Sequence, residues 1–279
     1  MSLADLPPLR ESLEAYGLVA NKGFGQHFLL DLNITRKIAR LAGADETTAV
    51  IEVGPGPGGL TRALLETGAR VIAVEKDARF LPLLQVIADA ADGRLTVIHA
   101  DALMVDEAAL VADHAGGLPA RIVANLPYNV GTPLLIKWLT GAFRPEAMAL
   151  MFQKEVAERI VAGVGDDAYG RLAVISQALC EAQIVMSLPA RAFTPPPKVD
   201  SAVVSLVPRP ERPRDALIAA VERVTAAAFG QRRKMLRSSL KALGGADLCE
   251  AASLEPDRRA ETVPVEGFLG LAEALIARG

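Results

Sequence analysis

A glycine-rich turn directly after a short apolar strand constrains the fold of this chain more than any other feature. The run Val50–Val53 leads into residues 54–59, Gly-Pro-Gly-Pro-Gly-Gly, and a helical pattern follows. Glycines at such a strand-to-helix turn allow the backbone to approach a ligand closely, although a glycine turn can also exist without a ligand. The spacing of Gly54, Gly56 and Gly59 fits the dinucleotide fingerprint. It therefore predicts a parallel α/β sheet with a nucleotide-like cofactor at one edge.

Acidic side chains follow the next two apolar runs. Glu75 ends the run Val71–Val74, where its carboxylate would accept hydrogen bonds from ribose hydroxyls, a pattern that suits NAD and S-adenosylmethionine equally. Asp101 follows the run Leu95–His99, and its carboxylate could accept from an adenine amino group or cap the segment that comes next. Since the carboxyl ends of parallel strands share one crevice, we expect both side chains beside the glycine turn.

The tetrapeptide Asn125-Leu126-Pro127-Tyr128 follows a further apolar run and predicts a site for an amino group on a planar base. Pro127 has a fixed φ and keeps Leu126 out of the α region, so the loop is stiff. The Asn125 side-chain oxygen and the Leu126 carbonyl can accept two N–H groups, and Tyr128 offers a face for stacking. An ordinary strand-to-helix turn is the alternative, since Asn, Pro and Tyr are common in turns.

Seven apolar runs alternate with helical patterns along most of the chain. This alternation predicts a doubly wound α/β fold with a mostly parallel, seven-stranded sheet and a small all-α C-terminal domain. The last two runs, 182–186 and 201–207, are joined by a proline-rich connection without a helix. We therefore expect them to pair antiparallel at one edge of the sheet.

Proline punctuation and periodicity divide the chain into four parts. Residues 1–20 form an N-terminal helical extension with a helix over Leu9–Leu18, and residues 21–208 form the cofactor-binding catalytic domain. Residues 209–214 are a proline-rich linker, and residues 215–279 are a helical C-terminal domain.

The net charge of −3 is not that of a uniformly basic nucleic-acid binder, so contacts to phosphates must be local. In the C-terminal part, a run of cations without an intervening acid is expected on one helical face, where it would neutralise phosphates or form an ordinary solvated surface. This predicted RNA-binding run comprises Arg232, Arg233, Lys234 and Arg237, continued by Lys241. Lys22 is a further phosphate candidate.

Several longer motifs resemble the ribosomal RNA adenine dimethyltransferases, over residues from about 21 to the C-terminus. The resemblance is carried by the segments 25–29 (GQHFL), 52–56 (EVGPG), 125–128 (NLPY), 153–156 (QKEV), 169–172 (YGRL), 193–201 (FTPPPKVDS) and 229–234 (FGQRRK). The last two are most similar to the bacterial enzymes that dimethylate two adjacent adenosines near the 3′ end of 16S rRNA. Bacterial members often carry Asn where this chain has His27.

The resemblance implies S-adenosylmethionine as the cofactor and 16S rRNA within an assembling small ribosomal subunit as the partner of a monomeric enzyme. The implied cofactor-binding residues are His27, Leu29, Gly54, Gly56, Glu75, Asp101 and Asn125. The implied catalytic residues are Asn125, Leu126, Pro127, Tyr128 and Phe193, with Phe193 stacking on the face of the base opposite Tyr128. Because such an enzyme must reach N6 of adenine, its target is an unpaired or extruded adenosine.

Three other functions are compatible with parts of this pattern. A DNA adenine-N6 methyltransferase usually has Pro at the position of Leu126, which counts against that class. A non-catalytic RNA-binding assembly factor could retain the cofactor pocket, but the intact tetrapeptide speaks against a purely structural role. The length and basic run of the C-terminal part disfavour a large-subunit resistance methylase.

Cysteine usage and hydropathy indicate a soluble, cytoplasmic protein. Cys180 and Cys249 lie far apart and lack metal-ligand spacing, so we expect buried thiols and no metal site. The N-terminal residues do not resemble a signal peptide, and no apolar run is long enough to span a bilayer.

Overall fold

The structure, a computed structural model, describes residues 2–20, 23, 25–231 and 233–278. The chain divides into two compact units, one of residues 1–157 and 184–207, the other of residues 158–183 and 208–279. Residues 158–183 were expected in the catalytic domain, but they group with the C-terminal helices, because helix α8 (Arg171–Leu179) packs against α9 (Asp215–Gly230) and α12 (Val265–Ala277). The assignment of functions to the predicted domains stays a prediction.

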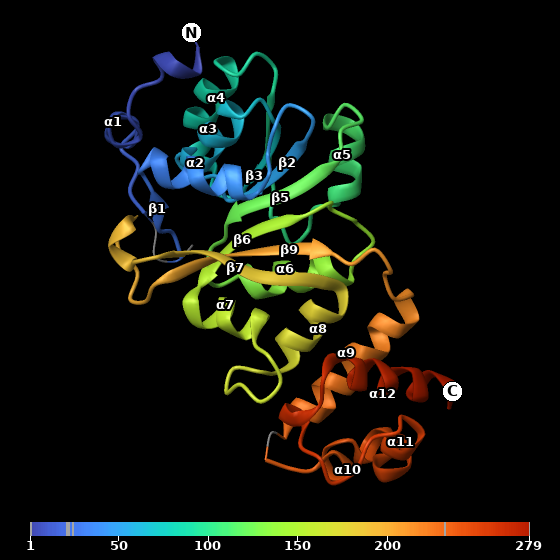
Figure 1. The fold of residues 1–279 in the computed structure, drawn as a ribbon. Helices are drawn as coiled ribbons and strands as arrows, with labels where there is room; N and C mark the ends of the chain where they lie inside the picture. Colours follow the sequence, from blue (N-terminus) through green and yellow to red (C-terminus); the bar gives the residue numbers. More distant parts are fainter. Residues whose placement is uncertain (1, 21–22, 24, 232, 279) are drawn as a thin grey trace. The chain divides into compact units, whose positions relative to one another are not determined.

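Within the described residues, the main sheet has seven strands in the order β4-β3-β2-β5-β6-β9-β7 (Figure 1). Their bounds are β2 Ala49–Val53, β3 Arg70–Glu75, β4 Leu95–His99, β5 Ala120–Asn125, β6 Met148–Gln153, β7 Cys180–Leu188 and β9 Ser201–Pro208. The pairs β2/β3, β3/β4, β2/β5 and β5/β6 are parallel, whereas β9 runs antiparallel to β6. The predicted α/β fold is confirmed, and the last two predicted strands are neighbours at one edge, as expected.

Alternate side chains of the central strands belong to two apolar cores. Val71 and Ala73 of β3 pack in a core with residues of α2, α3 and α4, which lie together in Figure 1. Ile72, which points to the opposite face, packs with residues of α5. The bounds are α2 Leu32–Leu41, α3 Gly59–Glu66, η3 Ala78–Phe80, α4 Leu81–Asp89, α5 Glu107–His114 and α6 Gly131–Thr140. Both faces are thus covered by helices, which explains why the strands are almost continuously hydrophobic.

The N-terminal segment is fixed to the first unit by polar and backbone contacts. This segment contains the short helices η1 (Leu3–Asp5) and α1 (Leu9–Ala15). Helix α1 ends before Leu18, its predicted last residue, because Gly17 has a φ of +62°. Arg62 of α3 is buried and donates to the Pro7 carbonyl at 2.6 Å. Further along, β1 (Phe28–Leu29) pairs antiparallel with β8 (Phe193–Thr194), which follows η4 (Ala190–Ala192). Two segments distant in the chain therefore form a small separate sheet.

The second unit is mainly helical and confirms the predicted all-α character of the C-terminal part. Its further elements are α10 Leu236–Ser239, η5 Lys241–Leu243, α11 Gly245–Ala251 and η6 Ala260–Thr262, while α7 (Lys154–Val161) runs from the first unit into the second. Tyr169 is buried and donates its hydroxyl to the Val263 carbonyl at 2.9 Å, and Phe229 lies between the rings of Tyr169 and Phe268. Both cysteines are buried free thiols, as expected. In the part of the chain that is described, the helices are too short or too polar to cross a membrane.

Gly59, at the start of α3, provides a test of how closely the glycine turn is packed. A Cβ at this position would lie 2.6 Å from the Leu29 carbonyl oxygen and 3.1 Å from a Leu9 methyl group. We expect Gly59→Ala to lower the free energy of unfolding by about 1–3 kcal/mol, because backbone atoms must shift to relieve the overlap. Gly230→Ala, at the end of α9 and with open space around its Cβ, is the matched control and should be neutral or slightly stabilising. Urea denaturation of both variants measures the difference, and equal stabilities would contradict this packing.

Candidate active site

A cavity opens where the parallel strands β2, β3, β4 and β5 end, and residues 25–29 form another part of its wall. The predicted site residues that line it are His27, Leu29, Gly54, Gly56, Glu75, Asp101, Asn125, Leu126, Pro127 and Tyr128. Strand ends separated by tens of residues in the sequence therefore meet at one place, as expected for an open parallel sheet.

Glu75 joins the end of β3 to the glycine turn. Its buried carboxylate accepts from the Gly56 N–H at 3.0 Å and from the Asp77 N–H at 2.7 Å. Gly54 and Gly56 have φ values of +68° and +51°, which glycine adopts without strain. Burial raises the pKa of Glu75, although the two backbone donors act in the opposite direction. Each carboxylate oxygen can accept a second bond, so the group can serve both the turn and a ligand hydroxyl.

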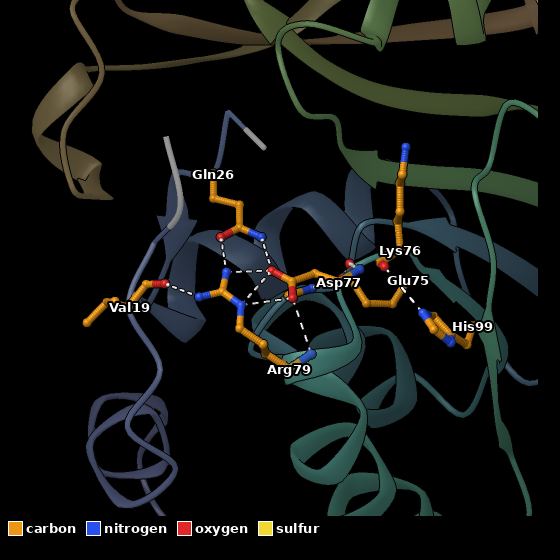
Figure 2. Close-up of polar contacts among 8 residues, drawn as sticks. Val19, Gln26, Glu75, Lys76, Asp77, Arg79 and His99 are labelled. Atoms are coloured by element: carbon orange, nitrogen blue, oxygen red, sulfur yellow. Dashed lines mark hydrogen bonds and ion pairs between the residues drawn. The ribbon is translucent and has the colours of Figure 1, made fainter. Parts of the chain in front are cut away.

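A polar network around Asp77 connects the N-terminal segment to the residues that follow β3, and no pattern in the sequence predicted it. Figure 2 shows that the Asp77 carboxylate contacts both Gln26 and Arg79. Gln26 Nε2 donates to Asp77 at 2.9 Å, Arg79 Nη2 donates to the same carboxylate at 2.6 Å, and Arg79 also donates to the Val19 carbonyl. Bonding to Arg79 holds the pKa of Asp77 below its usual range. Because Gln26 lines the cavity, this network fixes one cavity wall.

Asp101 caps the turn that its sequence position allowed, and its predicted contact to an adenine amino group stays a prediction. Its Oδ1 accepts from the Leu103 N–H at 3.0 Å, so it stabilises the turn that follows β4. Its Oδ2 accepts from Lys76 Nζ at 2.7 Å, and this contact lowers the pKa of Asp101 and keeps it ionised. An ionised carboxylate at the cavity can still accept from an amino group.

Lys137 of α6 also stabilises the turn that follows β4. Its Nζ donates to the carbonyls of Ala102 and Val105 and to Glu107 Oε1, at 2.8, 2.5 and 2.7 Å. The buried Glu107 also accepts from Trp138 Nε1 at 2.7 Å. This ion pair therefore positions the Asp101 turn, and it too escaped prediction from the sequence.

The tetrapeptide presents two acceptors at the cavity. Asn125 Nδ2 donates to the His27 carbonyl at 3.2 Å, which leaves the amide oxygen as an acceptor. In the described residues, no backbone N–H donates to the Leu126 carbonyl. The Pro127 carbonyl, in contrast, accepts from Val130 and Gly131 at 3.1 Å and starts α6. The loop is thus rigid where it precedes the helix.

Tyr128 is half-buried and held at two points. Its hydroxyl lies 2.7 Å from Ser201 Oγ, and its ring stacks on His27 with centroids 5.3 Å apart at 29°. His27 Nδ1 is in turn 2.8 Å from the Pro195 carbonyl. Burial raises the pKa of Tyr128, so the phenol stays protonated at neutral pH.

Phe193 lies apart from the other predicted catalytic residues. It is 3% exposed, packs in the apolar core of the first unit and is not among the residues of the cavity wall. Its pairing with Leu29 across β1 and β8 directs the ring into that core. In this conformation the ring presents no face to an entering base, so its stacking role stays a prediction that requires a rearrangement.

The predicted RNA-binding run does not form one helical face, and this part of the prediction is wrong. Helix α9 ends at Gly230, and Arg233 and Lys234 are exposed in the connection to α10. Arg237 lies in α10 and pairs with Asp257 at 2.9 Å. A run of charged residues constrains the backbone weakly, because it has no apolar face that helix formation would bury. Lys22 and Arg232 lie outside the described residues.

Glu52 of β2 is a cavity residue for which the sequence suggested no separate role. It is 1% exposed, and among the described residues its Oε2 has no hydrogen-bond partner. Burial raises the pKa of Glu52 to about 8, against the opposing effect of Thr61, and the charge of Glu75 raises it further. The side chain is therefore largely protonated at neutral pH.

The sheet order and the glycine-lined cavity define an α/β protein of the Rossmann-like methyltransferase class. A dimethyladenosine transferase from Plasmodium falciparum is similar in structure, with a TM-score of 0.73 and 26% identity over 88% of this chain and 96% of that one. The 23S rRNA methyltransferase ErmE matches with a TM-score of 0.67 and 27% identity over 89% of this chain and 99% of that one.

Sequence comparison defines the family. The model of the family described as ribosomal RNA adenine dimethylase matches residues 17–277. A protein of Phenylobacterium zucineum named ribosomal RNA small subunit methyltransferase A is 69% identical over 278 residues, covering 100% of this chain and 96% of that protein. The chain belongs to the ribosomal RNA adenine dimethylase family, which confirms the resemblance inferred from its motifs. It is thus an enzyme whose substrate is ribosomal RNA.

Two lysines that hold the Asp101 turn allow a matched test of buried against exposed ion pairing. Lys137→Met leaves the buried Glu107 carboxylate without its cation and should lower the free energy of unfolding by about 3 kcal/mol. Lys76→Met removes a pair of the same 2.7 Å length, but the Lys76 side chain is 60% exposed and the loss should stay below about 1 kcal/mol. Denaturant titrations measure the free energy of unfolding of both variants. A larger decrease for Lys76→Met than for Lys137→Met would contradict the greater importance of the buried ion pair.

The raised pKa of Glu52 predicts a pH dependence of stability. The folded state binds the Glu52 proton more tightly than the unfolded state, in which the pKa of this carboxyl is near its ordinary value of 4.5. The contribution of Glu52 protonation to the free energy of unfolding is therefore complete below about pH 4.5. It is lost as the pH rises towards about 8. Glu52→Gln, which stays neutral, should flatten this decline and be more stable than the wild type above pH 8. Thermal unfolding from pH 5 to 9 measures this pH dependence, with Glu46→Gln at an exposed position as the control. Parallel stability curves for the wild type and Glu52→Gln would disprove the role of Glu52.

Proposed function

We propose that this enzyme uses S-adenosylmethionine to dimethylate N6 of two adjacent adenosines near the 3′ end of 16S rRNA in an assembling small ribosomal subunit. The observation that carries the proposal is the pair of acceptors at Asn125 and Leu126, placed beside Tyr128 in the same cavity as the glycine turn. The relative from Phenylobacterium zucineum, named as a small-subunit methyltransferase, supports this choice of RNA.

The residues at the cavity suit this cofactor. The glycine turn allows close approach, Glu75 offers acceptor positions for ribose hydroxyls, and the ionised Asp101 suits an adenine amino group. His27 and Leu29 line the same cavity. S-adenosylmethionine supplies an electrophilic methyl group on a sulfonium. The role of the protein is to hold this group and the target nitrogen in line.

The acceptors at the tetrapeptide explain how N6 becomes reactive. The Asn125 amide oxygen and the Leu126 carbonyl accept from the N6 hydrogens and favour a tetrahedral nitrogen whose lone pair leaves ring conjugation. Tyr128 stacks on the base and fixes its plane. Alkylation makes the N6 proton acidic, so water can take it and no strong general base is required. The Asn125 contribution grows as the nitrogen becomes tetrahedral, and it therefore acts mainly on turnover.

RNA docking on a protein with a net charge of −3 requires local cations. Arg233, Lys234 and Arg237 are exposed and suit phosphate contacts, and Lys22 and Arg232 remain candidates from the sequence. The target adenosine must be unpaired or extruded to reach the cavity. We further propose that the enzyme acts as a monomer in the cytoplasm, where ribosomal subunits assemble.

A large-subunit methylase is the second candidate, because ErmE shares the fold. Its 27% identity contrasts with the 69% identity of the small-subunit relative, which favours the small subunit. An assembly factor without catalysis is no longer an alternative, because the chain belongs to an enzyme family, and the geometry of Asn125 also speaks against it.

The function is tested on small ribosomal subunits from a strain that lacks this protein. Mass spectrometry of their 16S rRNA should show that N6,N6-dimethyladenosine is missing, and the purified protein with S-adenosylmethionine should restore it. Asn125→Ala should lower kcat by about 10- to 100-fold with a smaller effect on the KM for the subunits. Isolated large subunits serve as the control substrate.

Restoration of the modification in large subunits instead would overturn the choice of RNA. A folded Asn125→Ala variant with nearly full activity would show that Asn125 is a turn residue.

Salt dependence tests the RNA contacts. Replacing Arg233, Lys234 and Arg237 by Gln should weaken binding to the unmethylated subunits and flatten its dependence on log salt concentration by roughly 0.7–0.9 unit per lost phosphate contact. The charge-matched control replaces three exposed cations of the first unit, Arg10, Lys37 and Arg40. Cofactor affinity should be unchanged in both. If both variants flatten the salt dependence of binding equally, the cations act only through the net charge of the protein. If the salt dependence of the first variant equals that of the wild type, Arg233, Lys234 and Arg237 form an ordinary solvated surface.

A further inference from the structure

Tyr128 is fixed by two contacts that restrict different rotations of its side chain. The phenol oxygen lies on the axis about which the ring turns, so a bond to this atom restrains χ1 and leaves ring rotation free. The hydroxyl is 2.7 Å from Ser201 Oγ, which supplies this restraint. The ring of His27, stacked at 5.3 Å and 29°, restrains the rotation about the ring axis.

Ser201 is well suited to anchor another side chain. It begins β9, pairs with Gln153 in the sheet ladder and is completely buried. A buried hydroxyl needs a hydrogen-bond partner, and the Tyr128 phenol provides it. The position of the phenol is thus set by the central sheet rather than by the loop that carries Tyr128.

His27 decides which face of Tyr128 is available. It covers one face of the ring, and its Nδ1 contact to the Pro195 carbonyl at 2.8 Å keeps it there. A base that stacks on Tyr128 must therefore use the other face. With Phe193 in the core, Tyr128 is the aromatic ring of the predicted catalytic set that lies at the cavity.

We propose that Ser201 is a positioning residue for methyl transfer, which holds the Tyr128 ring so that the target adenine stacks on the face opposite His27. The inference rests on the proposed function and adds a residue outside the cavity wall to it. A ring that is already in place loses little conformational freedom when the base arrives, so the N6 group meets the acceptors of Asn125 and Leu126 in the reactive orientation.

The test uses the full-length protein and unmethylated small subunits from the strain that lacks it. Ser201→Ala and Tyr128→Phe remove the two partners of one hydrogen bond. Each should lower kcat about five- to tenfold, with the calorimetric affinity for S-adenosylmethionine unchanged. The double variant should be no slower than the slower single variant, because both changes remove the same contact. Ser205→Ala, on the same strand and face as Ser201, is the control and should keep wild-type kcat.

Each other outcome has a defined meaning. Multiplied effects in the double variant, or a Tyr128→Phe enzyme with full kcat, would overturn the positioning role. If Ser201→Ala is too unstable to assay, Tyr128→Phe decides, since it removes the same bond without emptying a buried position. A wild-type protein that leaves the subunits unmethylated would refute the proposed function itself, whereas an active wild type with unchanged variants refutes this inference and leaves the function intact.

Discussion

The hydrogen bonds that the Gly56 and Asp77 amides donate to the Glu75 carboxylate are the interaction on which the cavity depends. They connect the turn after β2 to the end of β3, and a buried N–H that lost its acceptor would destabilise the site. Neighbouring strands alone would bring these ends near each other. The carboxylate fixes their spacing, and it does so with oxygens that can also face a cofactor. The structural role of Glu75 is therefore compatible with its proposed contact to the cofactor, and the same holds for Asp101, which accepts from the Leu103 amide and from Lys76.

The rest of the cavity wall comes from segments far from these strands, and each is attached by a different kind of contact. Residues 25–29 are held by Gln26 to Asp77, by the Asn125 amide to the His27 carbonyl, and by the pairing of β1 with β8. A hydrogen bond to a carboxylate, a hydrogen bond from an amide and a backbone ladder therefore act on four successive residues, 26–29. Such redundancy suits a wall that must keep its shape when a cofactor and a nucleoside occupy adjacent positions.

Local patterns in the sequence were sufficient for the strands, the glycine turn, the acidic strand ends and the tetrapeptide. Each of these depends on residues close in the chain, and parallel strand order then brings them to one edge. Partners across the chain were not predictable, such as Ser201 for Tyr128 or Lys137 for the Asp101 turn, because periodicity does not encode long-range pairing. The Phe193 assignment rested on the family resemblance, whereas the pairing of Phe193 with Leu29 directs its ring to the core. The cationic run was wrongly given a helical face, since charge alone does not select a backbone conformation.

The amide of Asn125 has two unlike ends, and the site uses the difference between them. The nitrogen end is engaged by the His27 carbonyl, so the orientation of the side chain is decided before any substrate arrives. An aspartate of the same shape could not give this bond, and its negative charge would face a carbonyl oxygen. The neutral amide also adds no charge to a cavity that already contains Glu75 and Asp101. Shape, polarity and direction are therefore set by one planar group, and close chemical substitutes for it are few.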